Sequence, residues 1–428
     1  MAKRRYVFSR LIKTIAKPFV SLRYRLHFTR DASLKHIKRP YFIFGNHPSF
    51  MDPFFMSLGH TQPINFVAND EYFRFKTINF LLKLTGAIPK TKFLTDAVAV
   101  RNIFRLKRDG SAIGVYPEGG RTWPGKTQPL LYPTARLVKK MGIPVVTVVT
   151  RGASTSLPRW ALHMRKGKIF LNYRLLLTPE QIADMTEQEI YAALQEALEH
   201  DEPQWQRERM IPYKGKKLAE RLEWFLYACP SCGGIETMTS GEDLYSCGQC
   251  GYTVRYNEFG FFEHPDTKAP ASPDNLNEWD ALQYEILRKK VAELKPGQTL
   301  LHNPSATLFL GQRGKSMLER ISTGELKLTT QGFTLTSVIG VSEIEFEQID
   351  TITINHKNTI DFYYKGHKLR ITLDNRLRCG YVWECAIKAL KQNLEMKKSA
   401  ESTDTENAGI TNTEVAAETA EIITTENQ

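Results

Sequence analysis

A histidine and an aspartate stand five residues apart in "GNHPSFMD", residues 45–52, directly after the apolar run "YFIFG". Histidine titrates near neutral pH, so His47 could take the proton from a hydroxyl group that attacks an acyl carbonyl. A carboxylate bound to the other ring nitrogen fixes the tautomer and stabilises the imidazolium that forms, a role that suits Asp52. The spacing therefore predicts a general base with its orienting partner, with a purely structural hydrogen bond between the two as the alternative.

A second block, "YPEGGRTW" at residues 116–123, combines a carboxylate, two glycines and an arginine. An arginine can grip a phosphate with two parallel hydrogen bonds, and glycines let backbone amides approach the same anion closely. The block therefore predicts an anion-binding loop that contains Glu118, Gly119, Gly120 and Arg121. A tight turn with a surface ion pair is the structural alternative.

The elements around the two blocks alternate between strand and helix. Apolar runs predict strands at residues 41–45, 64–68, 112–116, 144–150 and 168–174. Helical patterns lie between them, at residues 52–59, 71–84, 95–108 and 130–141. This alternation predicts an α/β domain with a largely parallel central sheet, in which chemistry gathers in the loops beyond the carboxyl ends of the strands. Each block follows a predicted strand, so we expect both to open on that face.

Two further blocks complete a series: "GAIPKTK" at residues 86–92 and "GIPVVTVVTRG" at residues 142–152. In this order, over about residues 40–175, the four blocks resemble the glycerolipid acyltransferase family, which includes the 1-acylglycerol-3-phosphate (lysophosphatidate) acyltransferases. The resemblance implies transfer of a fatty acyl group from acyl-CoA or acyl carrier protein to a lysophospholipid or glycerol phosphate, without a cofactor for the chemistry. It implies that His47 and Asp52 are catalytic. The residues it implies for substrate binding are Asn46, Ser49, Lys92, Glu118, Gly119, Gly120 and Arg121.

The sequence departs from the family pattern at two of these positions. Gly120 stands where threonine is usual, so one hydroxyl donor is lost. Lys92 stands where arginine is usual, and a lysine holds a phosphate as a point charge rather than as a fork. Lys92 could also be an ordinary solvated surface lysine. The departures leave room for a phospholipid transacylase, or for an acyltransferase that uses another acceptor.

Four of the six cysteines form two CxxC pairs, "CPSCGG" and "CGQCGY". The pairs are Cys229 with Cys232 and Cys247 with Cys250. Four thiolates with this spacing suit tetrahedral zinc at a closed structural site, and the segment resembles a zinc ribbon. Redox cysteines and vestigial pairs that bind no metal are the alternatives. We expect Cys379 and Cys385, near the last predicted helix, to be core thiols.

The charge is unevenly distributed along this chain of 428 residues, whose formal net charge is +12. Residues 1–30 hold nine Lys or Arg and no Asp or Glu, in a pattern that predicts an amphipathic helix on an anionic membrane surface. The sequence has no run of 18 apolar residues that would predict a membrane-spanning helix, and no secretory signal is apparent. Both observations favour a peripheral protein on the cytoplasmic face. A basic nucleic-acid-binding or scaffold protein is the non-enzymatic alternative, but residues 233–246 between the cysteine pairs hold three acids and no Lys or Arg.

The composition divides the chain into six predicted segments. They are a basic membrane-surface segment (1–39), the acyltransferase domain (40–226), the zinc ribbon (227–262), a linker with a helix (263–297), a β-rich domain (298–396) and a disordered acidic tail (397–428). The β-rich domain weakly resembles a pleckstrin-homology-like barrel, because several antiparallel runs precede one helix that carries Trp383. An unrelated small β domain is the alternative.

Overall fold

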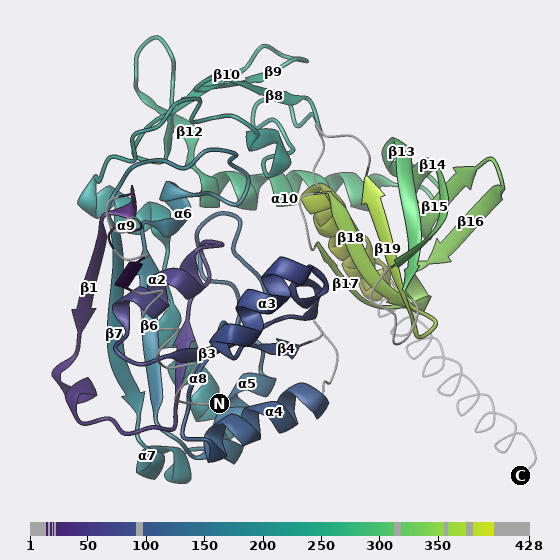
Figure 1. Ribbon diagram of the computed structural model, residues 1–428. Helices are drawn as coiled ribbons and strands as arrows, with labels where there is room; N and C mark the ends of the chain where they lie inside the picture. The colour runs from purple at the N-terminus through teal and green to yellow at the C-terminus, as the bar shows by residue number, and fades with distance from the viewer. Residues whose placement is uncertain are drawn as a thin grey trace, which may run out of the picture. The chain divides into compact units, whose positions relative to one another are not determined.

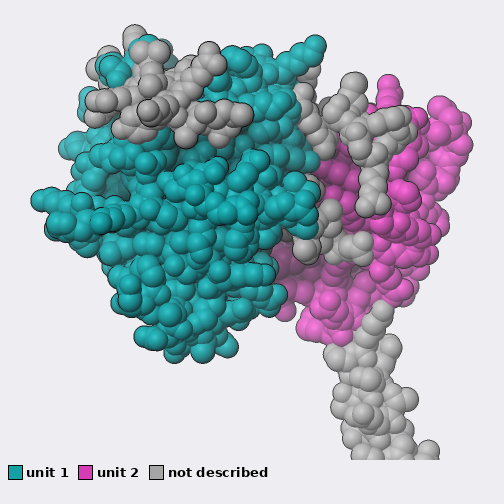
Figure 2. Space-filling model, turned by 60° about the horizontal axis from the view of Figure 1, so that its bottom comes forward, with its two compact units in different colours: residues 1–283 teal, residues 284–428 magenta. Residues whose placement is uncertain are grey.

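The computed structural model describes residues 23–90, 97–311, 318–354, 358–373 and 380–397, together with Thr14, Ile15, Pro18 and Val20. Two compact units divide the chain, Met1–Gln283 and Tyr284–Gln428 (Figure 2). Lys92, Cys379, the acidic tail beyond residue 397 and most of the basic N-terminal segment lie outside the described residues.

A seven-stranded sheet, in the order β1-β7-β6-β2-β5-β3-β4, forms the centre of the first unit (Figure 1). Its strands are β1 (Leu26–Arg30), β2 (Tyr41–Gly45), β3 (Ile64–Asn69), β4 (Ile88–Lys90), β5 (Ala112–Val115), β6 (Val145–Arg151) and β7 (Ile169–Leu177). The strands from β6 to β4 run parallel to their neighbours, and β7 runs antiparallel to β6. The predicted α/β fold with a largely parallel sheet is therefore confirmed.

The N-terminal region differs from the sequence prediction. Residues 26–30 were expected to continue a helix, but they form β1, which pairs in parallel with β7 from Leu26 opposite Ile169. The outer edge of β7 would otherwise present unpaired backbone groups, and pairing with β1 satisfies them. Strand β4, a short parallel addition at the other edge, was also not predicted.

Helices connect these strands much as the apolar periodicity indicates. They are α2 (Asp52–Gly59), α3 (Lys76–Thr85), α4 (Ala97–Arg108), α5 (Pro133–Met141), α6 (Ala153–Ser156), α7 (Pro179–Asp184), α8 (Glu187–Leu198) and α9 (Glu202–Arg209), with 3-10 turns η1 (Ala32–Lys35), η2 (Asp70–Arg74) and η3 (Leu222–Trp224). Thr178 and Thr186 begin α7 and α8 with reciprocal capping boxes, which satisfy amides that the helix itself cannot bond.

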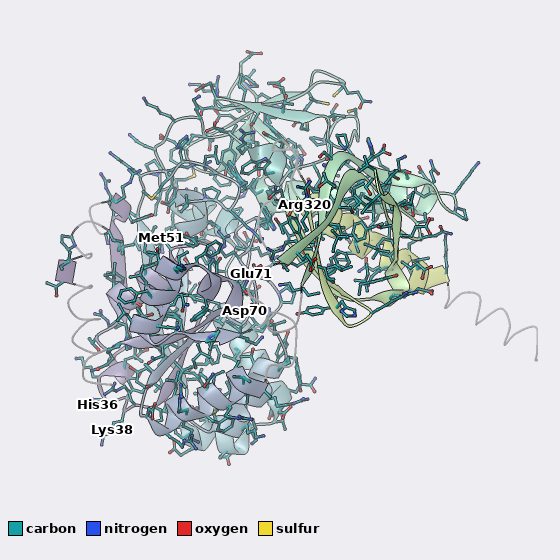
Figure 3. The ribbon with its side chains drawn as sticks, turned by 45° about the vertical axis from the view of Figure 1, so that its right-hand side comes forward. His36, Lys38, Met51, Asp70, Glu71 and Arg320 are labelled. Carbon is teal, nitrogen blue, oxygen red and sulfur yellow. The ribbon has the colours of Figure 1, made fainter. Side chains whose placement is uncertain are left out.

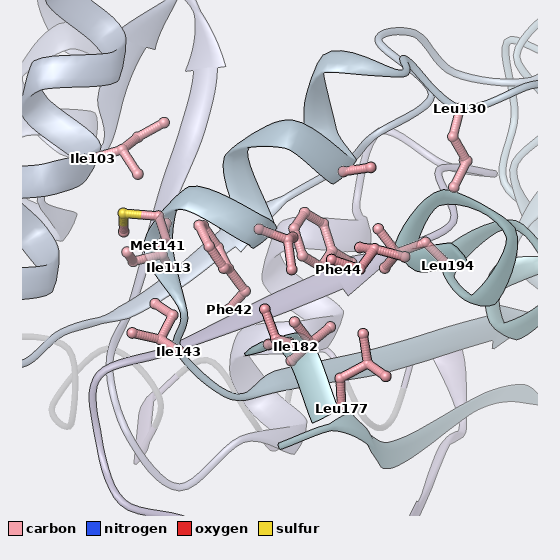
Figure 4. Packing of buried hydrophobic residues seen from close by; sticks show 14 of the residues in the cluster. Phe42, Phe44, Ile103, Ile113, Leu130, Met141, Ile143, Leu177, Ile182 and Leu194 are labelled. Carbon is pink, nitrogen blue, oxygen red and sulfur yellow. The ribbon is translucent and has the colours of Figure 1, made fainter. Parts of the chain in front are cut away.

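Both faces of the sheet are covered, and this explains why β2 is apolar at every position. Phe42 and Phe44 point to a cluster that contains Ile103 of α4, Val138 of α5 and Leu194 of α8 (Figure 4). The intervening side chains of β2 join a second cluster with the α2 residues Phe55 and Met56. A strand buried on both sides cannot alternate apolar and polar residues.

The cysteine-bearing part of the first unit is a five-stranded antiparallel sheet in the order β12-β11-β10-β9-β8. Its strands are β8 (Met238–Gly241), β9 (Leu244–Cys247), β10 (Thr253–Tyr256), β11 (Phe261–Glu263) and β12 (Pro270–Asn275), and α10 (Leu276–Glu293) follows. Residues 264–275 were expected to form a linker, but β12 lies among them and pairs with β11. Trp279 is buried and donates from Nε1 to the carbonyl of Ala228 at 2.9 Å, so α10 is anchored here.

The second unit holds a seven-stranded antiparallel sheet in the order β16-β15-β14-β13-β19-β18-β17. Its strands are β13 (Thr299–Gly311), β14 (Leu318–Thr329), β15 (Gly332–Ser337), β16 (Gly340–Glu345), β17 (Ile349–Ile354), β18 (Thr359–Tyr364) and β19 (His367–Leu373), with η4 (Phe346–Gln348) before β17. A helix over residues 380–397 buries Trp383, whose ring stacks on Phe333 of β15. The expected order of antiparallel strands and then one helix is thus observed.

The described helices include none with the length and apolar character that a membrane span requires.

The joint between α2 and β7 supplies a stability prediction. Tyr173 donates from its hydroxyl to the carbonyl of Met56 at 2.7 Å, and a Cβ at Gly59 would collide with that hydroxyl and with the Phe28 ring. We expect Gly59→Ala to lower the free energy of unfolding by about 1–3 kcal/mol, because the packed joint must shift. Urea unfolding measures it. Gly241→Ala is the matched control because open space surrounds its Cβ position, and equal effects of the two would contradict the prediction.

Candidate active site

The two predicted blocks meet at one edge of the central sheet. Strands β2 and β5 are parallel neighbours, with Phe44 opposite Val115, so the loops that follow them leave from the same edge. The amide of Thr122 donates to the carbonyl of His47 at 3.2 Å and joins the two loops directly. This is the position beyond the carboxyl ends of parallel strands where open α/β sheets place their ligand sites.

His47 and Asp52 form a hydrogen-bonded pair. Nδ1 of His47 lies 2.8 Å from Oδ2 of Asp52, and the amide of Ser49 donates to the same oxygen at 2.8 Å. The Asp52 side chain is 1% exposed and the His47 side chain 19% exposed, so the carboxylate is sealed while the imidazole still meets solvent. Burial raises the pKa of Asp52 well above its usual value, and the Ser49 amide and the charge of Arg121 oppose that rise.

The position of Asp52 follows from local sequence. It is the first residue of α2, where the positive end of the helix dipole favours a carboxylate. Pro53 follows it, and its missing N–H is tolerated there because the first amides of a helix have no partner within the helix. Ser49 accepts from the Met51 amide at 3.3 Å through Oγ, which tightens the turn before the helix. Ser49 is buried, and both of these hydrogen bonds serve the loop itself.

Asn46 fastens the histidine loop to the neighbouring strand. Its Nδ2 donates to the carbonyl of Thr150 at 3.0 Å, and the Thr150 amide donates back to Oδ1 at 2.8 Å. This reciprocal pair spans the ends of β2 and β6, where the two strands have stopped pairing through their backbones. Most of the block that contains Thr150 forms the buried strand β6, as the apolar run at residues 144–150 predicts.

The Glu118 side chain links the loop that carries His47 to the segment that follows the glycine–arginine block. Its Oε1 accepts the His47 amide at 2.6 Å and its Oε2 accepts the Gln128 amide at 2.8 Å. Burial raises its pKa to about 7, against the lowering effect of the Gln128 and His47 amides. Glu118 therefore holds the backbone of the candidate base.

Arg121 lies beside the pair without bonding to it. Its guanidinium sits 6.0 Å from the ring centre of Phe50, and within the described residues no hydrogen bond or ion pair occupies its side chain. Burial lowers its pKa, whereas Tyr72 and Asp52 raise it. A largely enclosed cation of this kind is suited to receive an anion. Arg159 donates from Nη1 to the Arg121 carbonyl at 2.7 Å and fixes the backbone there.

The glycines of this block have different surroundings. Gly119 has a φ of +73°, a left-handed conformation that glycine adopts without strain. Around Gly120 no heavy atom lies within 4 Å of where a Cβ would be, so the threonine that is usual in the family would have room. Lys92, the other departure from the family pattern, lies outside the described residues.

Sequence reasoning missed two supporting groups. The Tyr116 ring stacks on the His47 ring, with centroids 4.2 Å apart and an interplanar angle of 18°. The sequence signal that could have identified Tyr116 is its position directly before "PEGG". The second is the buried Glu202, which accepts from the Gly152 amide and the Thr155 hydroxyl, each at 3.0 Å, and lies 2.7 Å from Nε2 of His200. No sequence pattern distinguishes Glu202 from a surface residue of α9.

The acidic side chains Asp70 and Glu71 begin η2, just after β3 ends (Figure 3). The β3 strand runs parallel to β5, so η2 begins at the same edge of the sheet as the two blocks. Tyr72, which influences the pKa of Arg121, follows them in this turn. The end of β3 thus contributes polar groups to the same region as the ends of β2 and β5.

The four paired cysteines form one cluster elsewhere in the first unit. Their sulfur atoms all lie within 4.8 Å of one another, with Cys229 3.7 Å from Cys250 and Cys232 3.8 Å from Cys247. Four thiolates about 2.3 Å from one zinc ion stand roughly 3.8 Å apart in a tetrahedron, so the donor set fits a single metal ion. Backbone amides point at the sulfur atoms of Cys229 and Cys232. The cluster could therefore bind a metal such as zinc.

Comparisons with known proteins bear on the first site. Residues 25–151 match the family model described as Acyltransferase. The chain is 25% identical over 116 residues to the chloroplastic 1-acyl-sn-glycerol-3-phosphate acyltransferase BAT2 of Brassica napus, a match that covers 26% of this chain and 33% of that relative. It is 27% identical over 108 residues to the 1-acyl-sn-glycerol-3-phosphate acyltransferase of Borreliella burgdorferi, covering 25% of this chain and 43% of that one.

The matched stretch therefore spans less than half the length of either relative. Among solved structures, the 1-acyl-sn-glycerophosphate (LPA) acyltransferase PlsC from Thermotoga maritima is similar at 21% identity, with a TM-score of 0.39, over 44% of this chain and 76% of that chain. The family match over residues 25–151 indicates an acyltransferase domain, and the two distant relatives are 1-acyl-sn-glycerol-3-phosphate acyltransferases.

The buried Glu118 gives a pH-dependence prediction. Its pKa is raised from 4.5 to about 7 in the fold, so the native state binds more protons than the unfolded state between these values. The stability that Glu118 contributes is therefore complete below about pH 4.5 and falls as the pH rises towards 7. We expect the unfolding free energy of the wild type, relative to Glu118→Gln, to fall by about 1–3 kcal/mol between pH 5 and 8. Urea titrations at the two pH values measure this, and a difference that stays constant or grows would contradict it.

Proposed function

We propose that this protein transfers a fatty acyl group from acyl-CoA or acyl carrier protein to the free hydroxyl of a lysophospholipid such as lysophosphatidate, or of glycerol phosphate. One observation carries the proposal: the sealed Asp52 carboxylate lies 2.8 Å from Nδ1 of His47, on a loop held against the glycine–arginine block. The acyltransferase match over residues 25–151 supports the same chemistry.

The proposed reaction needs one proton carrier. His47 donates its Nδ1 proton to Asp52, so Nε2 takes the proton of the acceptor hydroxyl as that oxygen attacks the thioester carbonyl. The tetrahedral intermediate collapses, the carbon–sulfur bond breaks, and the imidazolium returns its proton to the departing thiolate. Asp52 stabilises the imidazolium between these steps. The acceptor hydroxyl takes the place that a serine has in a hydrolase triad.

The neighbouring residues would bind and place the acceptor. Arg121 grips the acceptor phosphate, with Lys92 as a second cation, and the amides around Gly119 and Gly120 approach the same anion. Glu118 acts through the His47 amide. Asn46 and Ser49 keep the loop in shape through the bonds they make to backbone groups, which supports positioning rather than direct contact with the substrate.

A second candidate is an acyltransferase or transacylase for another acceptor. The open space at Gly120 favours it, because a bulkier head group could occupy the volume where the family carries threonine. The proposed base and its partner serve either acceptor.

We propose a structural zinc ion at the four cysteines and a peripheral location on the cytoplasmic face of an anionic membrane. The zinc would link the two CxxC turns. With four sulfur ligands it would have no open coordination position for catalysis. The antiparallel sheet and single helix of the second unit support the proposal of a pleckstrin-homology-like domain.

The proposed base gives the activity prediction. We expect His47→Ala to lower acyl transfer from labelled acyl-CoA to lysophosphatidate in vesicles by about 10²-fold or more, because the general base is lost. Asp52→Asn should also lower the rate, since an amide cannot stabilise the imidazolium. His36→Ala, an exposed histidine in the segment between β1 and β2, is the matched control and should keep full activity. Equal activity of the His47 variant and the wild type would remove His47 from the mechanism.

The cysteine cluster gives the metal prediction. We expect one zinc ion per purified chain by elemental analysis, and loss of that zinc in Cys232→Ser, whose serine is a poor zinc ligand. Cys385→Ser should keep the zinc, because Cys385 lies in the second unit, outside the cluster. Chelation should lower the thermal unfolding temperature, since metal binding contributes to folding. A zinc content unaffected by Cys232→Ser would argue against this site.

A further inference from the structure

Two loop segments of the first unit pair to build an exposed basic surface. Lys166 and Lys214 exchange backbone hydrogen bonds of 2.8 and 2.9 Å, so "RKGK" at residues 165–168 lies beside "YKGKK" at residues 213–217. The Ile169 amide donates to the Arg25 carbonyl at 3.3 Å and brings the start of β1 alongside. The exposed side chains that result, called the basic patch below, are Arg23, Arg25, Lys166, Lys168, Lys214 and Lys216.

Within the described residues, no ion pair joins an acidic side chain to any of the six cations of the basic patch. The three sequence segments that form it, residues 23–30, 165–168 and 213–217, contain no Asp or Glu. Two acidic side chains near these segments have other partners: Glu220 lies 3.5 Å from His163, and Glu242 pairs with Lys217 at 3.2 Å. A surface of this kind attracts an anionic partner.

The buried side chain of Arg165 anchors the backbone of the basic patch. Arg165 is buried between the rings of Trp160 and Tyr256, 4.9 and 5.2 Å from their centres, and bonds the carbonyls of Thr155 and Leu218. Its two lysine neighbours in the sequence therefore start from a rigid backbone, and the cationic side chains extend from it into solvent.

The basic patch lies on the active-site edge of the sheet. The β7 strand runs antiparallel to β6, so its first residues lie beside the end of β6, with Phe170 opposite Arg151. The β2 strand is parallel to β6 and ends at this same edge, where His47 follows. Figure 1 shows the starts of β1 and β7 at the end of the sheet that α6 and α9 cover.

Exposed aromatic side chains occur on the same edge. Phe50 and Phe54, on either side of the catalytic candidate Asp52, are 52% and 54% exposed, and Leu162 near the patch is 47% exposed. A soluble polyanion would bind the lysines but leave these apolar groups in water, whereas a lipid interface takes both. In the sequence, residues 1–22 add six Lys or Arg and no Asp or Glu.

We propose that the basic patch binds the headgroup phosphates of an anionic lipid bilayer and sets the active-site edge against the membrane. The inference rests on the proposed function only in its choice of a lipid surface. Each lysine near an anionic surface strengthens membrane partition by about fivefold. The effect is electrostatic and should be screened by salt.

The test is vesicle flotation of the full-length chain. The patch variant replaces Lys166, Lys168, Lys214 and Lys216 with Gln. The matched control variant replaces four exposed bases that precede parallel strands at the opposite edge, Lys35, Lys38, Arg108 and Lys140, also with Gln. Figure 3 shows His36 and Lys38 at the end of the sheet away from Met51. Both variants change the net charge equally, and all eight side chains are exposed, so folding should be unaffected.

With vesicles of phosphatidylcholine and phosphatidylglycerol at 7:3, we expect the patch variant to lose at least about tenfold in partition coefficient and the control variant less than threefold. At 0.5 M NaCl the difference should disappear. Equal losses in the two variants would show that only net charge matters, and unchanged binding of the patch variant would show that the lysines face no lipid. Either result overturns the proposal.

Two further measurements distinguish lipid binding from binding of another partner and from the proposed catalysis. An acidic carrier protein is the rival partner, and a patch variant that binds vesicles normally but needs more acyl carrier protein for turnover would assign the patch to that protein and overturn the lipid proposal. His47→Ala should bind vesicles as the wild type does. Vesicle binding without acyl transfer in the wild type would thus refute the proposed function while leaving the membrane inference intact.

Discussion

The buried carboxylate of Asp52 is the constraint on which the candidate active site depends. A carboxylate sealed from water must be compensated, and this one receives the imidazole of His47, the amide of Ser49 and the positive end of α2. Those three requirements fix the loop between β2 and α2 in one conformation. The imidazole is thereby oriented while it keeps enough exposure to meet a substrate.

The rest of the site is arranged to keep that loop from moving. Asn46 bonds it to the end of β6, and Glu118 bonds the His47 amide to the backbone that follows the glycine–arginine block. Glu202 holds the next layer, where the loop after β6 packs. Asn46 and Glu118 bond only backbone groups, whereas Glu202 also contacts the Thr155 hydroxyl and the His200 ring. The Arg121 side chain makes no hydrogen bond or ion pair within the described residues, which supports its proposed role as the anion-binding group.

The parts beyond the central sheet have different means of support. Of the four cysteines, Cys247 ends β9 and the others lie in loops beside this sheet of short strands, so a metal ion would cross-link these segments. The second unit needs no such aid, because its seven strands and the helix with Trp383 bury their own core. The basic patch is built by the pairing of two loops, and its charge lies at the same edge of the central sheet as the candidate active site.

The sequence alone predicted the α/β class, the helices α2 to α5, the grouping of the four paired cysteines and the juxtaposition of the two blocks. These follow from local periodicity, from fixed spacing and from the rule that parallel strands end at one edge. Only the tertiary structure decided that residues 26–30 pair as β1, that Tyr116 stacks on His47, that Glu202 is buried, and that Lys166 meets Lys214. Each of these is a contact between segments distant in the chain, and its energy comes from burial and pairing that no local pattern records.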